Sequence, residues 1–304
     1  MRREEAITME QKEFSDLTKD WLHSGQHITI GGRQIFVVEK GSGPVLLLLH
    51  GFPTSCHDWR GIMDILAPEY RCVAFDFPGY GLSDKPVAYS YSLFQQADTV
   101  EGLVSTLGIY QAHVVSHDVG TSVHCELLAR HNSGDLGFEI TASTLLNGSM
   151  LQWLATITPF QELLGANKTL QQAIDLCNGG LEAYIPGLKG IMKRPNAITE
   201  NDATVMMELL RYQDGNRRLP AIAGYIRERY VNAERWLSGL SETKAPMQFL
   251  WADGDPIANI EMGRELHRLY PRARYTQLED LGHFLLMEDP AAIAAQIKEL
   301  QAAS

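Results

Sequence analysis

The chain has 304 residues, of which 45% are hydrophobic and 21% are charged, and its formal net charge is −11. This length and composition suit one large globular domain, or a core with an insertion, that buries enough surface to fold without a disulfide or a metal. The excess of acidic residues, interspersed with basic ones, argues against nucleic acid or an anionic membrane surface as a partner.

The cysteines and the N-terminal residues bear on the cellular compartment in which we expect the protein. There is no C-x-x-C pair and no metal-ligand spacing of cysteine with histidine, so we expect free thiols at Cys56, Cys72, Cys125 and Cys177. The first five residues turn acidic at once and lack the apolar stretch of a signal peptide. The longest apolar run, residues 45–49, is too short to span a bilayer. We therefore expect a cytoplasmic protein with no membrane partner.

The N-terminal part predicts a helix followed by a β-hairpin. Residues 9–22 carry apolar side chains at helical spacing, namely Phe14, Leu17, Trp21 and Leu22. Two strand-like stretches, residues 27–30 and 34–39, follow this helix, and Gly31-Gly32 is a typical turn pair between them. We interpret residues 1–25 as a helical arm attached to the core.

From residue 45 onward, short apolar runs without polar alternation follow one another along the chain. Such runs are typical of strands buried on both faces of a parallel sheet. Helix-length amphipathic segments, for example residues 92–107 and 119–131, separate most of them. This alternation predicts an α/β fold with a doubly wound, mostly parallel sheet. The predicted strands are residues 45–49, 72–75, 113–115, 140–146, 247–251 and 274–278.

One interval, from about residue 148 to residue 239, breaks this alternation. It contains helical patterns but no convincing buried strand, and prolines punctuate it at Pro159, Pro186, Pro195 and Pro220. We interpret it as a helical insertion that covers the sheet as a lid. The sequence thus predicts a core of residues 1–147 and 240–304 and a helical cap domain of residues 148–239.

Asp118 lies where a predicted strand turns sharply into a helix. Ser116, two residues before it, and Gly120, two residues after it, are small, as a nucleophile elbow requires, because so tight a turn leaves room only for the central side chain. The start of the helix favours an anion, so we expect an ionised carboxylate. Aspartate is also a common helix N-cap, so this motif alone does not decide the function.

Two further motifs make the elbow significant. Asp255 follows the predicted strand 247–251, and His283 follows the last predicted strand. All three side chains therefore come from the carboxyl ends of strands, which is the edge where open α/β sheets place their sites. The chain order of Asp118, an acid and then His283 is also the order of the hydrolase triad.

These motifs carry a family resemblance. Over nearly its whole length the chain resembles the α/β-hydrolase superfamily, and within it the epoxide hydrolase and haloalkane dehalogenase branch. It is most similar to the mesoderm-specific-transcript-like group. The motifs are His50-Gly51-Phe52-Pro53-Thr54-Ser55, Asp76-Phe77-Pro78-Gly79-Tyr80-Gly81-Leu82-Ser83-Asp84, Ser116-His117-Asp118-Val119-Gly120, Leu146-Asn147-Gly148 and Gly282-His283-Phe284.

The resemblance implies the α/β-hydrolase fold and a catalytic triad on matching positions. Asp118 is the expected nucleophile and His283 the expected base. Asp255, rather than Asp253, fits the acid position, because it stands one residue before a Pro-Ile pair. No cofactor and no metal is implied, and water is the only expected co-substrate.

The resemblance also implies an oxyanion hole made of backbone N–H groups. The matching positions are Phe52, in the His-Gly-x-Pro loop, and Val119, directly after the nucleophile. We expect the side chains of these two residues to serve packing rather than chemistry. His50 and His117 are expected to have structural roles.

An aspartate nucleophile decides the reaction class, because a carboxylate can displace a leaving group at sp³ carbon and form an ester with it. Two departures argue against a haloalkane dehalogenase: Val119 stands where that pattern has Trp, and Phe52 where it favours Asn. The arginines that follow the nucleophile in fluoroacetate dehalogenases are also replaced, since residues 119–122 are Val-Gly-Thr-Ser.

Epoxide opening needs an acid, which this branch supplies from lid tyrosines. Tyr225 is our candidate proton donor, although an ordinary half-exposed lid tyrosine fits the same pattern; Tyr184 and Tyr212 are candidates for a second donor. We therefore expect an epoxide hydrolase acting on a small apolar substrate, as a monomer or homodimer. Three alternatives stay open: a haloalkane dehalogenase with an atypical halide site, an ester or lactone hydrolase, and a non-catalytic binding protein of this fold.

Overall fold

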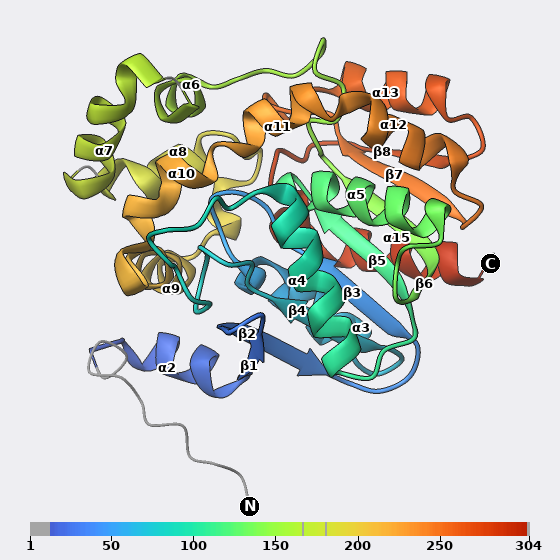
Figure 1. Ribbon diagram of the computed structural model, residues 1–304, viewed down its shortest axis with the longest axis horizontal. Coiled ribbons are helices and arrows are strands. Elements are labelled where there is room, and N and C mark those ends of the chain that lie inside the picture. The colour runs from blue at the N-terminus through green and yellow to red at the C-terminus, as the bar shows by residue number, and fades with distance from the viewer. Residues whose placement is uncertain (1–12, 166, 180, 303–304) are drawn as a thin grey trace, which may run out of the picture.

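The computed structural model describes residues 13–165, 167–179 and 181–302, and its centre is one sheet of eight strands (Figure 1). The strands lie in the order β1-β2-β4-β3-β5-β6-β7-β8. The pairs β1–β2 and β2–β4 are antiparallel, and all other pairs are parallel. The strands are β1 (Gln26–Ile30), β2 (Arg33–Lys40), β3 (Val45–Leu49), β4 (Arg71–Phe75), β5 (Gln111–His117), β6 (Glu139–Leu146), β7 (Met247–Ala252) and β8 (Arg274–Leu278).

The predicted mostly parallel sheet is thus confirmed, and each predicted strand is present. The largest difference is at β5, which extends the predicted range by two residues at each end, from 113–115 to 111–117. The apolar runs are buried on both faces, because successive side chains of a strand point to opposite sides. Leu46 and Leu48 belong to one hydrophobic cluster of the core, and Leu47 and Leu49 belong to the other.

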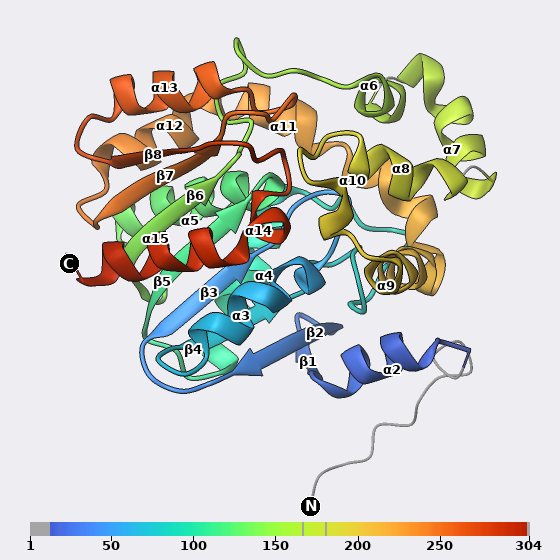
Figure 2. The same cartoon turned by 180° about the vertical axis from the view of Figure 1, so that it is seen from behind.

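Helices cover both faces of the sheet. The helices α4 (Leu93–Thr106), α5 (Val119–Ser133) and α12 (Ala233–Glu242) lie in front of it in Figure 1. The helices α3 (Arg60–Leu66) and α15 (Pro290–Ala302) lie on the opposite face, which Figure 2 shows in front. The sheet also contacts α13 (Ile260–Leu269) through β7 and β8. The short helix α14 (Leu285–Glu288) precedes α15, and the short 3₁₀ helix η1 (Cys56–Trp59) precedes α3.

The first described helix, α2 (Asp16–His23), is shorter than the predicted helix over residues 9–22. Ser15 is its N-cap, and the Ser15 hydroxyl accepts a hydrogen bond from the backbone N–H of Thr18. This cap explains the start of the helix, because a capped end satisfies backbone donors that have no partner within the helix. Residues 1–12, which belong to the predicted helical arm, lie outside the described residues.

The described residues between β6 and β7 form helices and turns without a strand, as the sequence predicts for this interval. In Figures 1 and 2 they gather beyond one end of the sheet, except α12, which packs on α5. The predicted cap boundary at residue 239 therefore falls inside a helix that covers the core. The other helices are α6 (Pro159–Gly165), α7 (Leu170–Gly179), α8 (Tyr184–Lys189), α9 (Glu200–Arg211), α10 (Leu219–Ile222) and α11 (Tyr225–Val231).

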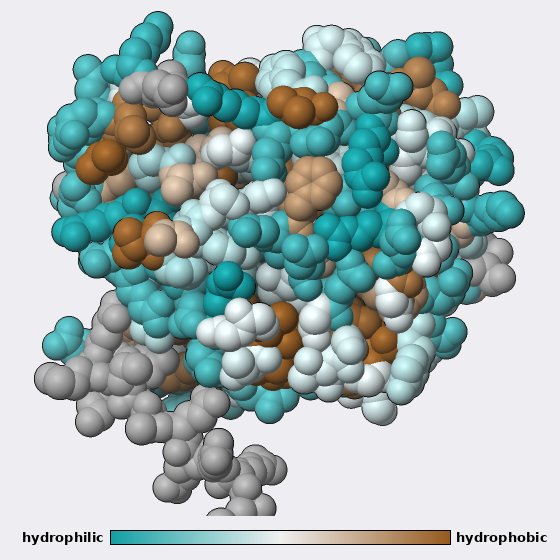
Figure 3. All heavy atoms as spheres, viewed as in Figure 1, coloured by the Kyte–Doolittle hydropathy of each residue, from teal (hydrophilic) through white to brown (hydrophobic). Residues whose placement is uncertain are grey.

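The surface is mixed in polarity. Figure 3 shows hydrophilic side chains over most of one face, with hydrophobic residues at several separate places. Among the residues that the structure describes, no helix is both long enough and apolar enough to pass through a bilayer. The four cysteines are buried and free, as expected.

Candidate active site

Asp118 stands at the junction of β5 and α5 in a strained backbone conformation. Its φ is 48° and its ψ is −114°, backbone angles that residues other than glycine rarely adopt. Gly120 allows this turn, because a Cβ atom there would lie 2.5 Å from the carbonyl oxygen of Leu49 in β3. The elbow predicted from small flanking residues is thus present, and it presents the carboxylate at the carboxyl edge of the sheet.

The loops after β5, β7 and β8 bring Asp118, Asp255 and His283 together. The Nδ1 atom of His283 lies 2.8 Å from Oδ2 of Asp255, and its Nε2 atom lies 3.8 Å from Oδ2 of Asp118. Since an ionised carboxylate only accepts hydrogen bonds, Nδ1 carries the proton, and Nε2 of the neutral ring keeps its lone pair. All three residues are buried, with exposed fractions of 2%, 4% and 2%.

Backbone groups orient the acid. Oδ1 of Asp255 accepts hydrogen bonds from the N–H groups of Ile257 at 2.7 Å and Ala258 at 3.1 Å, so that Oδ2 faces His283. Asp253, the other aspartate of this loop, is exposed. The acid loop therefore separates two nearby aspartates into one that contacts the histidine and one that points to solvent.

The His-Gly-x-Pro loop after β3 contacts the carboxylate of Asp118 from another side. The backbone N–H of Phe52 donates a 2.8 Å hydrogen bond to Oδ1 of Asp118. Val119, the second expected donor, is the first residue of α5 and has a buried side chain. Oδ1 is therefore held by the loop, whereas Oδ2 faces His283.

The charges around the site shift two pKa values in opposite directions. Burial opposes ionisation of Asp118, but the positive charge of Arg229 and the neighbouring His283 outweigh it and lower the pKa of this carboxyl. Burial also opposes the charged form of His283, but the charge and hydrogen bond of Asp255 outweigh it and raise the pKa of the imidazole. The arrangement keeps Asp118 ionised at neutral pH.

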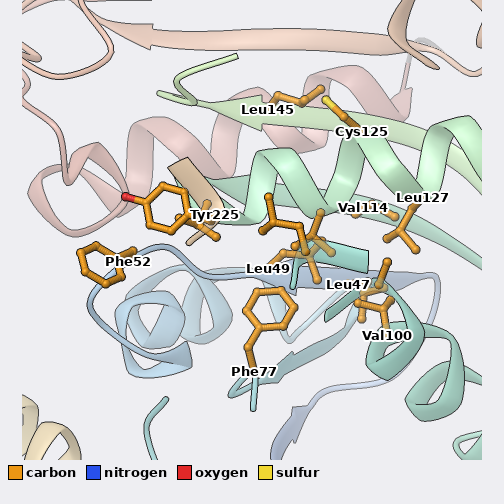
Figure 4. Close-up of a cluster of buried hydrophobic side chains, with 14 of the residues drawn as sticks. Leu47, Leu49, Phe52, Phe77, Val100, Val114, Cys125, Leu127, Leu145 and Tyr225 are labelled. Atoms are coloured by element: carbon orange, nitrogen blue, oxygen red, sulfur yellow. The ribbon is translucent and has the colours of Figure 1, made fainter. Parts of the chain in front are cut away.

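Tyr225, at the start of α11, is fully buried rather than half-exposed. Its ring packs on Phe52 with 5.4 Å between centroids, and Figure 4 shows the two rings side by side. Its hydroxyl oxygen accepts a 2.9 Å hydrogen bond from Nε2 of Gln161. Burial, and then the charge of Asp118, raise the pKa of this phenol, so it is protonated at neutral pH.

The other two candidate tyrosines have different surroundings. The hydroxyl of Tyr184 donates to the carbonyl oxygen of Pro53 at 3.3 Å, which directs its proton toward the backbone. The ring of Tyr212 packs against Phe14 of the N-terminal segment, with centroids 5.6 Å apart. Tyr225, by contrast, packs its ring on Phe52, the residue whose backbone N–H donates to Asp118.

His50 and His117 contact the backbone of the loops that form the site, in agreement with structural roles. His50 accepts a hydrogen bond from the N–H of Phe77 and lies 2.8 Å from the carbonyl oxygen of Gly51, to which its other nitrogen donates. His117 contacts the carbonyl oxygen of His283 at 2.8 Å through Nε2. Burial lowers the pKa of both imidazoles, so both rings are neutral.

Arg229, a buried arginine of α11, was not predicted from the sequence to belong to the site. Its Nε donates to the hydroxyl of Ser122 at 2.8 Å, and its Nη2 donates to the carbonyl oxygen of Asp118 at 3.3 Å. Nη2 also lies 4.0 Å from Oδ2 of Asp118. The only available signal was its place in the segment that contains Tyr225, because no spacing rule relates a helix of the inserted segment to the elbow.

Asn147, at the end of β6, was also not assigned a role. Its Nδ2 contacts the carbonyl oxygens of Gly282 at 3.1 Å and His283 at 3.3 Å, and its Oδ1 accepts a hydrogen bond from the N–H of Ala252. Asn147 thus connects the end of β7 to the loop that carries the histidine. Within the described ranges, no group of three or more histidine, cysteine or acidic side chains is arranged to bind a metal ion.

Comparisons with known proteins show which family the chain belongs to. A family model for the α/β-hydrolase fold matches residues 44–171. LipZ of Mycobacterium tuberculosis, a protein named as a hydrolase, is 34% identical over 92% of this chain and 96% of its own length. The mesoderm-specific transcript protein of Mus musculus is 32% identical over 91% of this chain and 86% of that protein. The structure of epoxide hydrolase CorEH is similar at a TM-score of 0.74 and 20% identity, covering 92% of this chain and 98% of the other. The chain therefore belongs to the α/β-hydrolase family and is a hydrolase of that fold.

Proposed function

We propose that this hydrolase opens epoxides to diols through a covalent ester on Asp118. The observation that carries the proposal is the combination of a carboxylate at the elbow with a buried phenol, Tyr225, that packs on the loop holding this carboxylate. A carboxylate attacks sp³ carbon, and a phenol supplies the proton that the opened ring requires.

In the first step, Oδ2 of Asp118 attacks a ring carbon, and the C–O bond of the epoxide breaks. The electron pair goes to the epoxide oxygen, which takes the proton of Tyr225. Since the phenol oxygen already accepts a hydrogen bond from Gln161, its own proton is free for donation. The resulting phenolate keeps the Gln161 bond, and the guanidinium of Arg229 lies 4.7 Å from the ring centroid. Both contacts stabilise the negative charge.

In the second step, His283 removes a proton from water, and this water attacks the carboxyl carbon of Asp118. The 3.8 Å gap between Nε2 of His283 and Oδ2 of Asp118 exceeds a hydrogen bond, so Nε2 is not occupied by the carboxylate. Negative charge develops on Oδ1, where the N–H of Phe52 donates; each such donor contributes about 3 kcal/mol in comparable sites. We assign the second donor to the N–H of Val119. When the intermediate collapses, the bond between the carboxyl carbon and Oδ2 breaks, and the imidazolium of His283 protonates the leaving alkoxide to give the diol. The new carboxyl group of Asp118 loses its proton, and the phenolate of Tyr225 takes one up, so that the carboxylate and the phenol are both restored.

The side chains beside the nucleophile support an epoxide rather than a haloalkane. A halide ion that leaves into a buried site needs N–H donors to replace its water. At the two positions where the dehalogenase pattern has Trp and Asn, this chain has the apolar side chains of Val119 and Phe52, and the side-chain N–H donors nearest the carboxylate belong to Arg229 instead. An epoxide does not need such donors, because its oxygen stays on the substrate and is protonated.

A parallel turnover assay tests this proposal. The protein is incubated with styrene oxide, bromobutane and nitrophenyl acetate, and diol formation, bromide release and nitrophenol release are measured. We expect diol formation to be the fastest reaction and to disappear in Asp118→Ala. Bromide release faster than diol formation would favour the dehalogenase alternative, and turnover of nitrophenyl acetate alone would favour the ester hydrolase. Binding without turnover of any substrate would favour the non-catalytic alternative.

A further inference from the structure

The position of Arg229 bears on the charge of the substrate. Arg229 is a buried residue, 6% exposed, and its side chain extends from α11 of the inserted helical segment to the first turn of α5. There it contacts Ser122 and the backbone of the nucleophile, 107 and 111 residues away in the sequence. Since burying a charged group is costly, an arginine in this place needs compensating contacts.

The protein provides hydrogen-bond acceptors for only some of the N–H groups of this guanidinium. Two of its five N–H groups have acceptors, namely the hydroxyl of Ser122 and the carbonyl oxygen of Asp118. Within residues 13–165, 167–179 and 181–302, no other acceptor lies within hydrogen-bond distance of Arg229. The carboxylate of Asp118, at 4.0 Å from Nη2, provides a counter-charge without a hydrogen bond. Three N–H donors therefore remain for a ligand or for water.

Arg229 also lines a small hollow that could take a ligand atom. Arg229 lines a hollow of about 20 Å³ between the segment that follows β6 and helix α11, with Ser149 and Ile226 among the other lining residues. This volume holds one or two water-sized groups. A guanidinium recognises a carboxylate best, because its planar donors match two carboxylate oxygens.

The proposed chemistry also changes the charge around Arg229. Once Asp118 becomes an ester, the negative charge beside Nη2 is lost, and the phenolate of Tyr225, whose ring centroid lies 4.7 Å from the guanidinium, carries it instead. An anionic group on the substrate would again place a negative charge beside Nη2 in the intermediate. Such a group would also leave Asp118 freer to act as a nucleophile in the first step, since Arg229 would then be paired with the substrate.

We propose that Arg229 binds a carboxylate of the substrate, so that the enzyme prefers epoxides with a carboxylate next to the ring. This inference rests on the proposed function for the reaction and on Arg229 for the specificity. The 4.0 Å distance between Nη2 and Oδ2 of Asp118 limits the carboxylate to one or two bonds from the attacked carbon. We thus expect the substrate, predicted from the sequence to be small and apolar, to carry a carboxylate as well.

A binding experiment tests the anion site independently of turnover. Phenylpropanoate and the matched neutral phenylpropanamide, neither of which can react, are titrated into the protein by calorimetry. We expect the acid to bind about 10-fold or more tightly than the amide, as hydrogen bonds to charged groups provide. In Arg229→Met this ratio should fall to about one. Arg227→Met, which removes an exposed arginine of the same helix, should keep the wild-type ratio.

A turnover experiment tests the substrate class. Phenylglycidate, an epoxide with a carboxylate on the ring, is compared with phenylglycidamide in the wild-type protein and in both variants. We expect a kcat/KM for the acid about 10-fold or more above that for the amide, and loss of this preference in Arg229→Met but not in Arg227→Met. Thermal melting of each variant checks that it is folded, and Arg229→Lys, which keeps the charge, should restore part of the preference.

The two experiments separate the two proposals. Equal binding of acid and amide in the wild-type protein, or an unchanged ratio in folded Arg229→Met, would overturn the anion site. If both epoxides turned over at the same rate, the epoxide proposal would stand and the specificity proposal would fail. If neither epoxide turned over but phenylpropanoate bound through Arg229, the anion site would stand and the epoxide proposal would fail.

Discussion

His283 and Asp255 are joined by a 2.8 Å contact between Nδ1 and Oδ2, and the other carboxylate oxygen of Asp255 is held by two backbone N–H groups. The acid loop therefore determines the orientation of the imidazole as well as its charge. Because Nδ1 faces Asp255, Nε2 is directed toward Asp118. From this arrangement we expect a different effect on the reaction when each of the three residues is substituted.

We expect Asp255→Asn to reduce turnover by about 1,000-fold or more, because an amide cannot orient and stabilise the imidazolium as a carboxylate does. Asp253→Asn is the matched control, since Asp253 is an exposed aspartate two residues away. Steady-state kinetics of both variants, with circular dichroism to verify folding, provide the measurement. A large loss in Asp253→Asn and a small one in Asp255→Asn would show that our assignment of the acid is wrong.

His283→Gln should separate the two halves of the reaction. The nucleophile remains, so the ester on Asp118 forms, but no base is left to activate water. Mass spectrometry of the intact variant after mixing with styrene oxide should show one added substrate mass, located on the peptide that contains Asp118. Asp118→Ala in the same experiment should show none. An unmodified His283→Gln protein that demonstrably binds the epoxide would contradict a covalent mechanism.

The pH dependence should differ between the two steps. The lowered pKa of Asp118 keeps the nucleophile ionised, whereas the raised pKa of His283 means that the base gains a proton above the ordinary histidine value of about 6.5. Hydrolysis of the ester should therefore slow as the pH falls through the pKa of His283, while ester formation continues. At a pH of about 5, rapid quenching of the wild-type reaction should reveal accumulated ester. The rate of ester formation in His283→Gln should stay constant over the same interval; parallel loss of both steps would contradict these roles.

The strands and the grouping of Asp118, Asp255 and His283 could be predicted from the sequence for a physical reason. Buried parallel strands have a distinctive apolar pattern, and their carboxyl ends meet at one edge, so residues that follow such strands come together. No comparable rule relates a helix of an insertion to the sheet that it covers. The contacts of Arg229 with Ser122 and of Gln161 with Tyr225 depend on how these helices pack, which the sequence pattern does not determine.

The most informative variant for the leaving group is Tyr225→Phe, because it removes the phenol hydroxyl and keeps the ring that packs on Phe52. Without a proton donor, the alkoxide would leave unprotonated in a buried site, which is costly. We expect styrene oxide opening to fall about 10-fold or more, in line with general-acid contributions of about 10²–10⁴. Any hydrolysis of nitrophenyl acetate should change little, because acyl transfer depends on the oxyanion donors instead.

Tyr230→Phe is the control for this variant, since Tyr230 lies on the same helix with 54% of its surface exposed. Gln161→Leu adds a second test of the same hydroxyl. This substitution removes the hydrogen bond from Gln161 that stabilises the phenolate, so Gln161→Leu should slow epoxide opening less than Tyr225→Phe does. The double variant should be no slower than Tyr225→Phe alone. If Tyr225→Phe opened styrene oxide at the wild-type rate, the proton would have to come from another group. Tyr80 would be the first to test, because it is buried and lines a hollow with Pro53 and Tyr184 beside the loop that contacts Asp118.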